Sequence, residues 1–446
     1  MNKLEEEIKQ ALTKQPEWVS QRAITNAKKY LDNELITKYE SKHIEPITDE
    51  EIIHPEKLTE NEKEKLTEIG KQHLQESKFA YFTMAGGIST SMGGCSKALL
   101  KAKNNLTFLE IKLNHVRAIQ EKYNCKIPFI IMTNEDTDES IMNFLKKENR
   151  LKNIDLIKIV QPVTTRFEEI KTTNKKELKV ATQKNGETSY APGGHYDAYI
   201  LLKEIKDELK QKGIQTIYLN NIDNLGATIN PLLIGIHKQK QSKFTPEIAR
   251  KDYNDKGGTF AKISKKPRLL EGPMVPEDYK EEFNDSETHK YFNTNLIYIE
   301  TELLNEFEEI NKQIPTFINK KTIEEKKMFG FEAAIGLIFG IKKSALIKVE
   351  RQKRFLPIKF LSDLWLLRSN FMKLNKEDWS VQQIKKQKPK ITINPEFISN
   401  LEEFEEKIPD GGETTDFSEL ESLKIELNDG KIKPNTEFKG KITLKN

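Results

Sequence analysis

Residues 80–98 read AYFTMAGGISTSMGGCSKA, an apolar β-like run followed by two pairs of glycines and, at the end, Lys97. Glycine is costly inside regular structure, so glycines gathered in this way mark backbone that turns sharply or approaches something closely. The stretch predicts a buried strand and a loop after it. That loop is either a flexible surface loop or a cradle for a phosphate or nucleotide.

Similar apolar runs recur along the chain and alternate with helical segments. The runs KFAYFTMA, IPFIIMT, IDLIKIV and IQTIYLNN alternate with segments such as FLEIKLNHVRAIQEKY and HYDAYILLKEIKDELKQKG. Buried parallel strands read as continuous apolar runs, and strand–helix alternation is typical of an α/β sheet. We therefore expect an α/β fold over residues 77–380.

The two ends of the chain differ from this central part. Residues 1–76 are strongly charged, and Leu4, Ile8 and Leu12 recur at helical spacing, which predicts amphipathic helices with solvated faces and no chemistry. Residues 381–446 read as short strands joined by Asn, Gly and Pro turns, which indicates a small β module. The predicted organisation is a helical N-terminal segment (1–76), a central domain (77–380) and a C-terminal β module (381–446).

The composition argues against several classes of protein. Lysine and arginine number 73 against 69 acidic residues, a formal charge of +4 that gives no support for a nucleic-acid binder. Two cysteines, Cys95 and Cys125, can form neither a disulfide framework nor a cysteine zinc site. The N-terminus does not read as a signal peptide, and no apolar run approaches the roughly 20 residues of a membrane helix. We expect a cytoplasmic protein with no nucleic-acid or membrane partner.

Candidate binding residues follow the apolar runs, because ligands of open α/β sheets bind at the carboxyl ends of the strands. The loop after Met84 matches neither a Walker A pattern nor G-x-G-x-x-G. After IQTIYLNN, Asp223 belongs either to an ordinary turn or to a site that holds a divalent cation against phosphate oxygens. On a strand, Asn221 and Asp223 would share one face, with Ile222 on the other.

TMAGGISTSMGGCSK resembles the nucleotide-binding loop of the UTP–glucose-1-phosphate uridylyltransferase (UDP-glucose pyrophosphorylase) family. The resemblance continues in order through TFLEIKLNHVRAIQEKYNCKIPFIIMTNEDTDES, YAPGGHYD, NNIDNLGA, DKGGTFAKISKKPRLLEGPMVP, KYFNTNLIYI, FGFEAAIG and KRFLPIKFLSDL. It covers residues 78–375, and the C-terminal strands are similar to the β-helix tail of that family.

The resemblance implies an α/β fold with a Rossmann-like, GT-A-like mixed sheet flanked by helices, and a small C-terminal left-handed β-helix. It implies that the substrates are UTP and glucose 1-phosphate, the cofactor Mg²⁺, and the products UDP-glucose and pyrophosphate. In-line attack of the sugar phosphate on the α-phosphorus is expected, which requires positioning and charge neutralisation rather than a protein nucleophile. The chain is expected to be a monomer or a homo-oligomer formed through the C-terminal module.

The resemblance also implies which residues form the site. Lys97 and Lys359 are expected to contact the phosphates, and Asp223 is expected to hold Mg²⁺. The implied nucleotide contacts are Met84, Ala85, Gly86, Gly87, Gln161, Gly194, Asn221, Ile222 and Asp223. The implied sugar-phosphate contacts are His195, Glu271, Asn293 and Asn295. Gln161 is expected to read the uracil edge, because an amide can donate and accept at once.

The sequence departs from the family pattern at several positions. Ala85 and Ser89 stand where the family usually has Asn and Gly, and the stretch before Lys97 is one residue shorter and lacks a proline. YAPGGHYD lacks the second proline and the later glycine of the family's Pro-Pro-Gly-His-Gly-Asp. Two alternatives therefore stay open: a UDP-N-acetylglucosamine or broad UDP-sugar pyrophosphorylase, and a catalytically inactive UDP-sugar-binding regulatory paralogue.

Overall fold

The computed structural model describes residues 1–35, 38–89, 92, 94–147, 149–171, 176–252, 255, 257–385, 388–433 and 436–445. Part of the glycine loop (residues 90, 91 and 93) therefore lies outside the described residues. The chain divides into two compact units. Unit 1 comprises Met1–Thr59, Ile159–Ile217 and Ile236–Lys348, and unit 2 comprises Glu60–Lys158, Tyr218–Gly235 and Val349–Asn446. The three-part division into 1–76, 77–380 and 381–446 has other boundaries and stays a prediction.

Unit 1 holds both N-terminal helices and the greater part of the antiparallel strands. Its helices are α1 (Asn2–Ala11), α2 (Glu17–Leu31), α6 (Asp197–Glu204), α7 (Lys206–Gln211), α9 (Lys280–Asn284) and α10 (Phe307–Gln313). Its strands are β1 (Ile44–Pro46), β2 (Ile52–Ile53), β10 (Val163–Thr165), β11 (Phe167–Lys171), β12 (Lys176–Val180), β13 (Tyr190–Pro192), β15 (Phe244–Arg250), β16 (Thr259–Ile263), β17 (Lys266–Leu270), β18 (Tyr291–Glu300), β19 (Phe317–Ile323) and β20 (Lys326–Glu332).

Unit 2 holds the strand before the glycine loop and the C-terminal strands. Its helices are α3 (Glu60–Gln75), α4 (Phe108–Tyr123), α5 (Glu135–Leu145), α11 (Arg351–Arg354), α12 (Leu361–Arg368) and α13 (Leu401–Lys407). Its strands are β3 (Phe79–Met84), β4 (Ile88–Ser89), β5 (Cys95–Ser96), β6 (Lys101–Lys103), β7 (Leu106–Thr107), β8 (Phe129–Asn134), β22 (Met372–Leu374), β23 (Val381–Gln383), β24 (Lys390–Ile393), β25 (Asp416–Glu426) and β26 (Glu437–Lys445). The unit boundaries fall within β9 (Leu156–Gln161), β14 (Thr216–Asn221), α8 (Pro231–Gln239) and β21 (Leu346–Val349).

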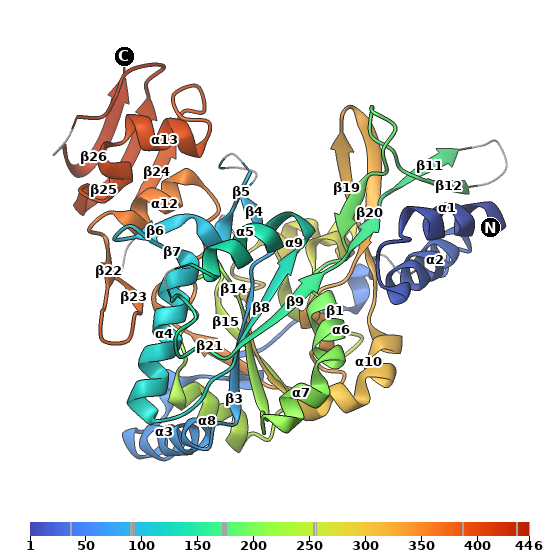
Figure 1. Ribbon diagram of the computed structural model, residues 1–446, viewed down its shortest axis with the longest axis horizontal. Coiled ribbons are helices and arrows are strands. Elements are labelled where there is room, and N and C mark those ends of the chain that lie inside the picture. The colour runs from blue at the N-terminus through green and yellow to red at the C-terminus, as the bar shows by residue number, and fades with distance from the viewer. Residues whose placement is uncertain are drawn as a thin grey trace. The chain divides into compact units, whose positions relative to one another are not determined.

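The fold is a mixed α/β structure, as the alternation of apolar runs and helical segments predicts. In unit 2, β3 and β8 pair in parallel and lie side by side in Figure 1. In unit 1, β15 and β18 pair antiparallel, and their register shifts between Glu247 and Ile248. The four apolar runs quoted from the sequence correspond to β3, β8, β9 and β14, so these predicted strands are confirmed.

Local sequence signals explain the ends of α4, the helix that follows the glycine loop. Thr107 caps its N-terminus by accepting from Glu110 N–H, and the Glu110 side chain reaches back to Thr107 N–H. This reciprocal pair satisfies two backbone donors that a helix start leaves without a partner. At the other end Asn124 adopts a left-handed conformation with φ 49°, which Asn tolerates better than bulkier residues.

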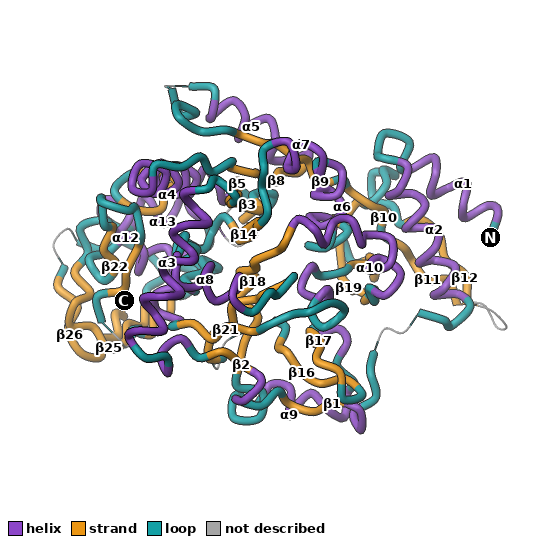
Figure 2. Tube along the Cα trace, turned by 90° about the horizontal axis from the view of Figure 1, so that it is seen from below, coloured by secondary structure: helices purple, strands orange, loops and turns teal. Residues whose placement is uncertain are grey.

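The two N-terminal helices pack on strands of the same unit rather than standing apart. Leu4 and Ile8 of α1 and Ala27 of α2 share a core cluster with Phe167 of β11 and Phe329 of β20. Figure 2 shows α1 and α2 beside β11 and β12. The amphipathic pattern predicted for these helices is confirmed, and their apolar faces are buried against unit 1.

The C-terminal residues form a β structure, as predicted. β24, β25 and β26 form a three-stranded sheet in which each strand pairs in parallel with the next. Cys95 and Cys125 are free cysteines. Across the described part of the chain, none of the helices combines the length and the apolar character needed to span a bilayer.

Candidate active site

The glycine loop of unit 2 folds back on itself. It follows β3, whose six residues are all buried, and Ile222 N–H donates to Met84 O (3.0 Å) where that strand ends. After the loop, β4 pairs antiparallel with β5, and Lys97 N–H donates to Gly87 O (3.2 Å). This hairpin brings the lysine next to the second glycine and to the residues that follow β14.

The side chain of Lys97 joins two other segments of unit 2. Its Nζ lies 2.6 Å from Asp223 Oδ2 and donates to Ile358 O at 2.9 Å. The Lys97 and Asp223 side chains are 19% and 13% exposed, so the pair is largely shielded yet open to solvent. Lys359 follows Ile358 directly, and its backbone N–H donates to Asp363 Oδ2 (3.1 Å). The structure thus brings Lys97, Asp223 and the backbone beside Lys359 together.

The segment Asn221–Asp223 has the expected alternation. Ile222 is buried at 2% exposure, whereas Asn221 and Asp223 are half-buried. The strand itself ends at Asn221, and Asn224 N–H donates to Asn221 O (3.2 Å), so Asp223 lies in the turn that follows. A carboxylate in such a turn stays accessible, which a ligand for phosphate-bound metal requires.

Sequence reasoning missed a buried lysine behind this turn. Lys112 of α4 donates from Nζ to Asn220 Oδ1 (2.7 Å), Asn224 O (3.0 Å) and Tyr81 OH (3.1 Å). Burial lowers the pKa of Lys112 to about 7, although the Asp223 charge opposes that shift. A signal existed: Lys112 lies four residues after the buried Phe108, within the apolar stripe of the helix.

The side chain of Asn224 ties the Asp223 turn to the segment that carries the second lysine. Asn224 Nδ2 donates to Arg354 O (3.1 Å), and Leu356 N–H donates to Asn224 Oδ1 (2.9 Å). Asn224 is 1% exposed, so these bonds form without competition from water. The turn and the segment before Lys359 are therefore held as one piece of structure.

Mg²⁺ is compatible with the donors that this region offers. Among the described residues, no three His, Cys, Asp or Glu side chains gather into a potential metal cage. Asp223 contributes one carboxylate. Mg²⁺ typically takes one or two carboxylates and completes its shell with water and substrate phosphates, so a single aspartate fits this mode of binding.

In unit 1, Gln161 and Gly194 lie in direct contact. Gln161 Nε2 donates to Gly194 O (3.0 Å) and to Asp197 Oδ2 (3.0 Å). Gly194 has φ 95°, and a Cβ there would lie 2.3 Å from Ala333 O, so glycine is required by conformation and by space. His195 follows on the exposed side of the same turn.

A residue from the N-terminal helices reaches this group, contrary to the expectation that residues 1–76 carry only solvated faces. Arg22 of α2 lies with Nη1 2.6 Å from Asp197 Oδ1. The Asp197 side chain is fully buried and that of Arg22 is 23% exposed. The two residues are far apart in the sequence, and no local pattern around Arg22 marks it as the partner of a buried carboxylate.

Three predicted sugar contacts lie close to one another in unit 1. Asn293 N–H donates to Gly258 O (2.9 Å), and a Cβ on Gly258 would lie 2.7 Å from Glu271 Oε1. Asn295 N–H donates to Asn293 Oδ1 (3.1 Å), and Asn295 has φ 59°, next to the register shift of β18. Burial, with the negative charge of Glu332, raises the pKa of Glu271 to about 7.

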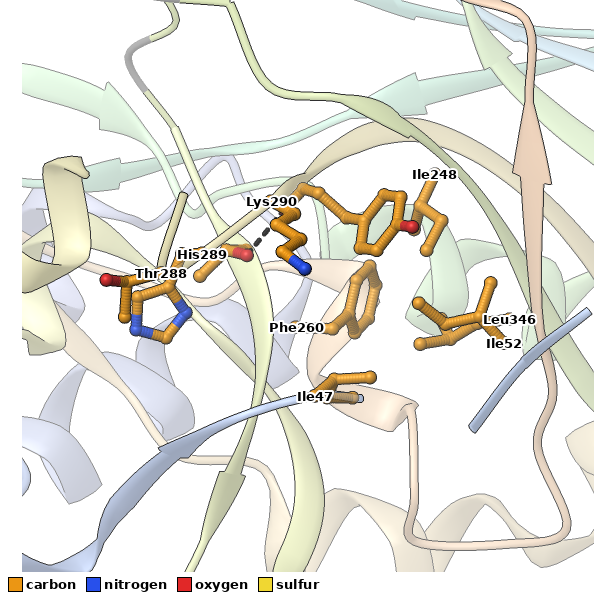
Figure 3. A pocket seen from close by; sticks show the side chains of 10 residues that line it. Ile47, Ile52, Ile248, Phe260, Thr288, His289, Lys290 and Leu346 are labelled. Carbon is orange, nitrogen blue, oxygen red and sulfur yellow. Dashed lines mark hydrogen bonds between the residues drawn. The ribbon is translucent and has the colours of Figure 1, made fainter. Parts of the chain in front are cut away.

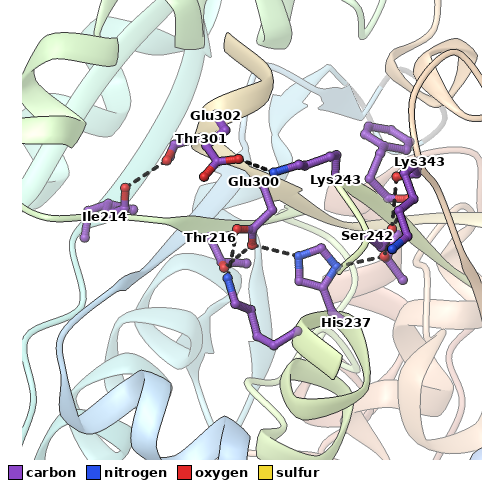
Figure 4. Close-up of polar contacts among 12 residues, drawn as sticks. Ile214, Thr216, His237, Ser242, Lys243, Glu300, Thr301, Glu302 and Lys343 are labelled. Carbon is purple, nitrogen blue, oxygen red and sulfur yellow. Dashed lines mark hydrogen bonds and ion pairs between the residues drawn. The ribbon is translucent and has the colours of Figure 1, made fainter. Parts of the chain in front are cut away.

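Two other features of unit 1 contain none of the predicted site residues. Figure 3 shows a cavity of about 10 Å³ among Ile47, Phe260 and His289, which is room for about one water molecule and not for a sugar phosphate. Figure 4 shows a buried polar network in which His237 Nε2 lies 2.9 Å from Glu300 Oε1 and Thr216 donates to the same oxygen. Lys238 Nζ is 2.8 Å from Glu300 Oε2, so this carboxylate is fully engaged in holding the fold.

Comparison with known proteins identifies the family. A family model described as UTP–glucose-1-phosphate uridylyltransferase matches residues 23–439. The chain belongs to this family. The match extends well beyond the site into both ends of the chain, so the predicted family is confirmed by more than its motifs.

Curated relatives carry the same family name. The chain is 27% identical to UTP–glucose-1-phosphate uridylyltransferase 2 of Dictyostelium discoideum, over 85% of this chain and 76% of that protein. It is 27% identical to the enzyme of that family from Solanum tuberosum, over 82% of this chain and 76% of the relative. A probable UTP–glucose-1-phosphate uridylyltransferase of Schizosaccharomyces pombe is 30% identical, over 67% and 60% of the two chains.

Solved structures share the fold. A UDP-glucose phosphorylase from Trypanosoma brucei superimposes with a TM-score of 0.79 at 24% identity, covering 98% of this chain and 94% of that one. The UDP-glucose pyrophosphorylase from Leishmania major gives 0.80 at 21% identity, with coverage of 100% and 95%. At this identity the likeness establishes the mixed α/β architecture alone.

Proposed function

We propose that the chain catalyses Mg²⁺-dependent transfer of UMP from UTP to glucose 1-phosphate, which yields UDP-glucose and pyrophosphate. One observation carries the proposal: Lys97, at the end of the glycine loop, contacts both Asp223 and the carbonyl that precedes Lys359. A lysine and a carboxylate in contact, next to the backbone that carries a second lysine, suit a triphosphate whose charge must be neutralised. Membership of the family, together with the names of the relatives, supports the identity of the substrates.

The contact between Lys97 and Asp223 suggests how the chain handles charge before and after the nucleotide arrives. Without a ligand, each of the two charged groups neutralises the other. Phosphate oxygens offer Lys97 a second partner, and Asp223 is then available as the ligand for Mg²⁺. When bound, Mg²⁺ supplies positive charge that offsets the repulsion between the α-phosphate and the sugar phosphate. Lys97 and Lys359 hold the phosphates in place, and Lys97 stabilises the pyrophosphate as it leaves.

The other predicted residues are assigned to binding the uracil base and the sugar. Among the described residues, the N–H groups of Gly86 and Gly87 donate no hydrogen bond within the protein, so they are suited to nucleotide oxygens. Met84 and Ala85, at the end of β3, and Asn221 and Ile222, at the end of β14, are also assigned to the nucleotide. Gln161 and Gly194 face uracil, and His195 contributes to binding rather than to proton transfer. Glu271, Asn293 and Asn295 bind the sugar hydroxyls.

The finer description of the fold is part of the same proposal. We assign the central strands to a Rossmann-like, GT-A-like sheet and the C-terminal strands to a left-handed β-helix. Parallel pairing of β24 with β25 and of β25 with β26 supports the β-helix, because each coil of such a helix adds a parallel strand. The protein is proposed to be cytoplasmic, and any homo-oligomer to form through this module.

One assay tests the activity. Purified protein is incubated with Mg²⁺ and UTP, and pyrophosphate release is followed with glucose 1-phosphate, N-acetylglucosamine 1-phosphate and other sugar 1-phosphates. We expect the highest kcat/KM with glucose 1-phosphate, and no release when Mg²⁺ is removed by a chelator. Release with every sugar phosphate would point to a broad pyrophosphorylase. No release with any of them, despite binding of UDP-glucose, would replace the proposal by the regulatory paralogue.

A further inference from the structure

The amide of Gln161 has its orientation fixed by two acceptors. Its Nε2 contacts a backbone carbonyl, Gly194 O, and a carboxylate oxygen, Asp197 Oδ2, each at 3.0 Å. Neither partner can donate in return, so the nitrogen must face them and both of its hydrogens are used. Among the described residues no hydrogen bond reaches Gln161 Oε1. The side chain therefore offers an acceptor and no donor, although an amide alone could offer either.

Asp197 is itself held in place from the opposite side. Arg22 Nη1 lies 2.6 Å from Asp197 Oδ1, so the carboxylate divides its oxygens between Arg22 and Gln161. The guanidinium of Arg22 stacks over Trp18 at 5.1 Å from the ring centre, and Trp18 Nε1 donates to Glu204 Oε1 (3.1 Å). Helix α2 is thus anchored in unit 1 at the point where Arg22 enters.

The glycine before Gly194 makes room for the arginine. A Cβ on Gly193 would lie 2.0 Å from Arg22 Nη2 and 2.9 Å from Asp197 Oδ2. Gly193 stands where the family motif Pro-Pro-Gly-His-Gly-Asp has its second proline. Proline has a Cβ, so this departure from the family pattern and the approach of Arg22 belong together.

We propose that Asp197, paired with Arg22, is a positioning residue for base selectivity, which fixes Gln161 so that its Oε1 accepts a hydrogen bond from N3–H of uracil. The inference rests on the proposed function, which places the base at Gln161. Uracil carries a hydrogen on N3 and cytosine carries a lone pair there. A Gln161 with its carbonyl oxygen fixed toward N3 favours UTP and repels CTP, and this preference depends on a carboxylate that contacts no substrate.

The substitution Asp197→Asn weakens the preference for UTP by a defined route. An asparagine has one acceptor oxygen, and the positive charge of Arg22, which lies 2.6 Å from Asp197 Oδ1 in the wild type, attracts that oxygen to its side. The Asn nitrogen then faces Gln161 Nε2, donor against donor, while Gly194 O still accepts from Nε2, so neither orientation of the amide is fixed and Gln161 can present Nε2 to the base. Nε2 donates to N3 of cytosine and clashes with N3–H of uracil. We expect the ratio of kcat/KM for UTP to that for CTP to fall about tenfold or more.

Removing the arginine as well restores the preference. In Arg22→Met/Asp197→Asn no cation competes for the asparagine oxygen, which turns to Gln161 and holds the amide in its original orientation. The ratio is therefore expected to return to within about threefold of wild type. Arg22→Met alone keeps the ratio and lowers the unfolding temperature, because it leaves a buried carboxylate without its cation. Each ratio comes from one preparation, so a smaller folded fraction does not alter it.

The matched control is Glu300→Gln, which changes another buried carboxylate of the same unit, one that is paired with Lys238 (Figure 4). It is expected to lower stability without altering the ratio. A wild-type ratio in Asp197→Asn, or no recovery in the double variant, overturns the inference. If the wild type releases no pyrophosphate, the proposed function fails, and the Kd ratio for UDP and CDP, measured by calorimetry, decides the inference instead. Equal Kd values for the two in wild type also overturn it.

Discussion

The groups assigned to the phosphates and those assigned to the base are built on different physical principles. In unit 2, Lys97 and Asp223 neutralise each other at 2.6 Å across a partly open surface. Such a contact can be exchanged when phosphate and metal compete for its two ends. In unit 1, Gln161 Nε2 is held by Gly194 O and by the carboxylate of Asp197, and the Asp197 side chain is fully buried. Under the proposed function, the charges that are exchanged lie near water, whereas the amide that discriminates between bases is held rigidly.

Among the described residues, each unit also contains an ionisable group whose pKa is shifted to near neutrality, and the two groups are of opposite kind. Burial lowers the pKa of Lys112 in unit 2 and raises that of Glu271 in unit 1, each to about 7. Both shifts favour the uncharged form. The stability of the two units is therefore expected to respond to pH with opposite signs.

The largest effect is expected at the phosphates. Lys359→Ala removes a charge that stabilises the transferring phosphates, and turnover should fall on the order of 100- to 1000-fold. KM for UTP should change far less, and the ratio of UTP to CTP should not change, because Gln161 is untouched. Steady-state kinetics with pyrophosphate detection measure all three quantities. The matched control is Lys353→Ala, an exposed lysine of the neighbouring helix α11. Turnover within about threefold of wild type would show that Lys359 does not stabilise the transferring phosphates.

The next largest effect concerns Lys112 and alkaline pH. Its native pKa of about 7 lies below the value near 10.4 of an unfolded chain, so between these values only the unfolded state binds the proton. Wild-type stability should therefore rise from pH 7 to pH 10, by about 3 kcal/mol relative to Lys112→Met. Urea unfolding at several pH values measures the difference. Lys122→Met, at an exposed position of the same helix, should follow wild type. Parallel curves for wild type and Lys112→Met would show that Lys112 keeps an ordinary pKa.

Glu271 should act in the opposite direction and more weakly. Its native pKa of about 7 lies above the unfolded value near 4.3, so between these values only the native state holds the proton. Stability should fall as pH rises from about 4.5 to 7, by about 1–2 kcal/mol relative to Glu271→Gln. Burial alone would raise the pKa of Glu300, but hydrogen bonds from His237 and Lys238 lower it to about 2. The charged form of Glu300 therefore stabilises the native state, and Glu300→Gln should be less stable than wild type at neutral pH. If the free energy of unfolding of Glu271→Gln varied with pH in parallel with that of wild type, the pKa of Glu271 would not be raised.

Local patterns in the sequence predicted part of the fold and of the candidate site, whereas contacts between residues distant in the sequence were not predictable. β3 and β14 were predictable because a fully buried strand is a continuous apolar run, and the residues after them were predictable because ligands bind at strand ends. Family motifs are local in the sequence, so they predicted Lys97 and Asp223 as site residues, and the structure places these two side chains in contact.

Contacts between residues that are distant in the sequence could not be predicted from such local patterns. Arg22 joins Asp197 across some 170 residues, and such a contact leaves no periodicity behind. Lys112 lies within an apolar stripe, but a single lysine there is more often one whose long stem reaches solvent. The role of Gln161 stays a prediction: its residue type suggested both a donor and an acceptor, and the two partners of Nε2 in the structure leave only the acceptor.

The smallest effect uses the two adjacent glycines of the loop as a matched pair. A Cβ on Gly86 would lie 3.3 Å from Asn134 Cβ, whereas one on Gly87 would lie 3.9 Å from Lys97 Cδ, an ordinary contact. Gly87→Ala should therefore leave the unfolding temperature unchanged, and Gly86→Ala should lower it slightly. If the nucleotide approaches this backbone closely, Gly87→Ala should nonetheless raise KM for UTP about tenfold. A higher KM without a lower unfolding temperature would show that the methyl group obstructs the nucleotide, because the free protein has room for that group. An unchanged KM would mean that the backbone at Gly87 does not touch the nucleotide, and the loop would then act only by carrying Lys97 to Asp223.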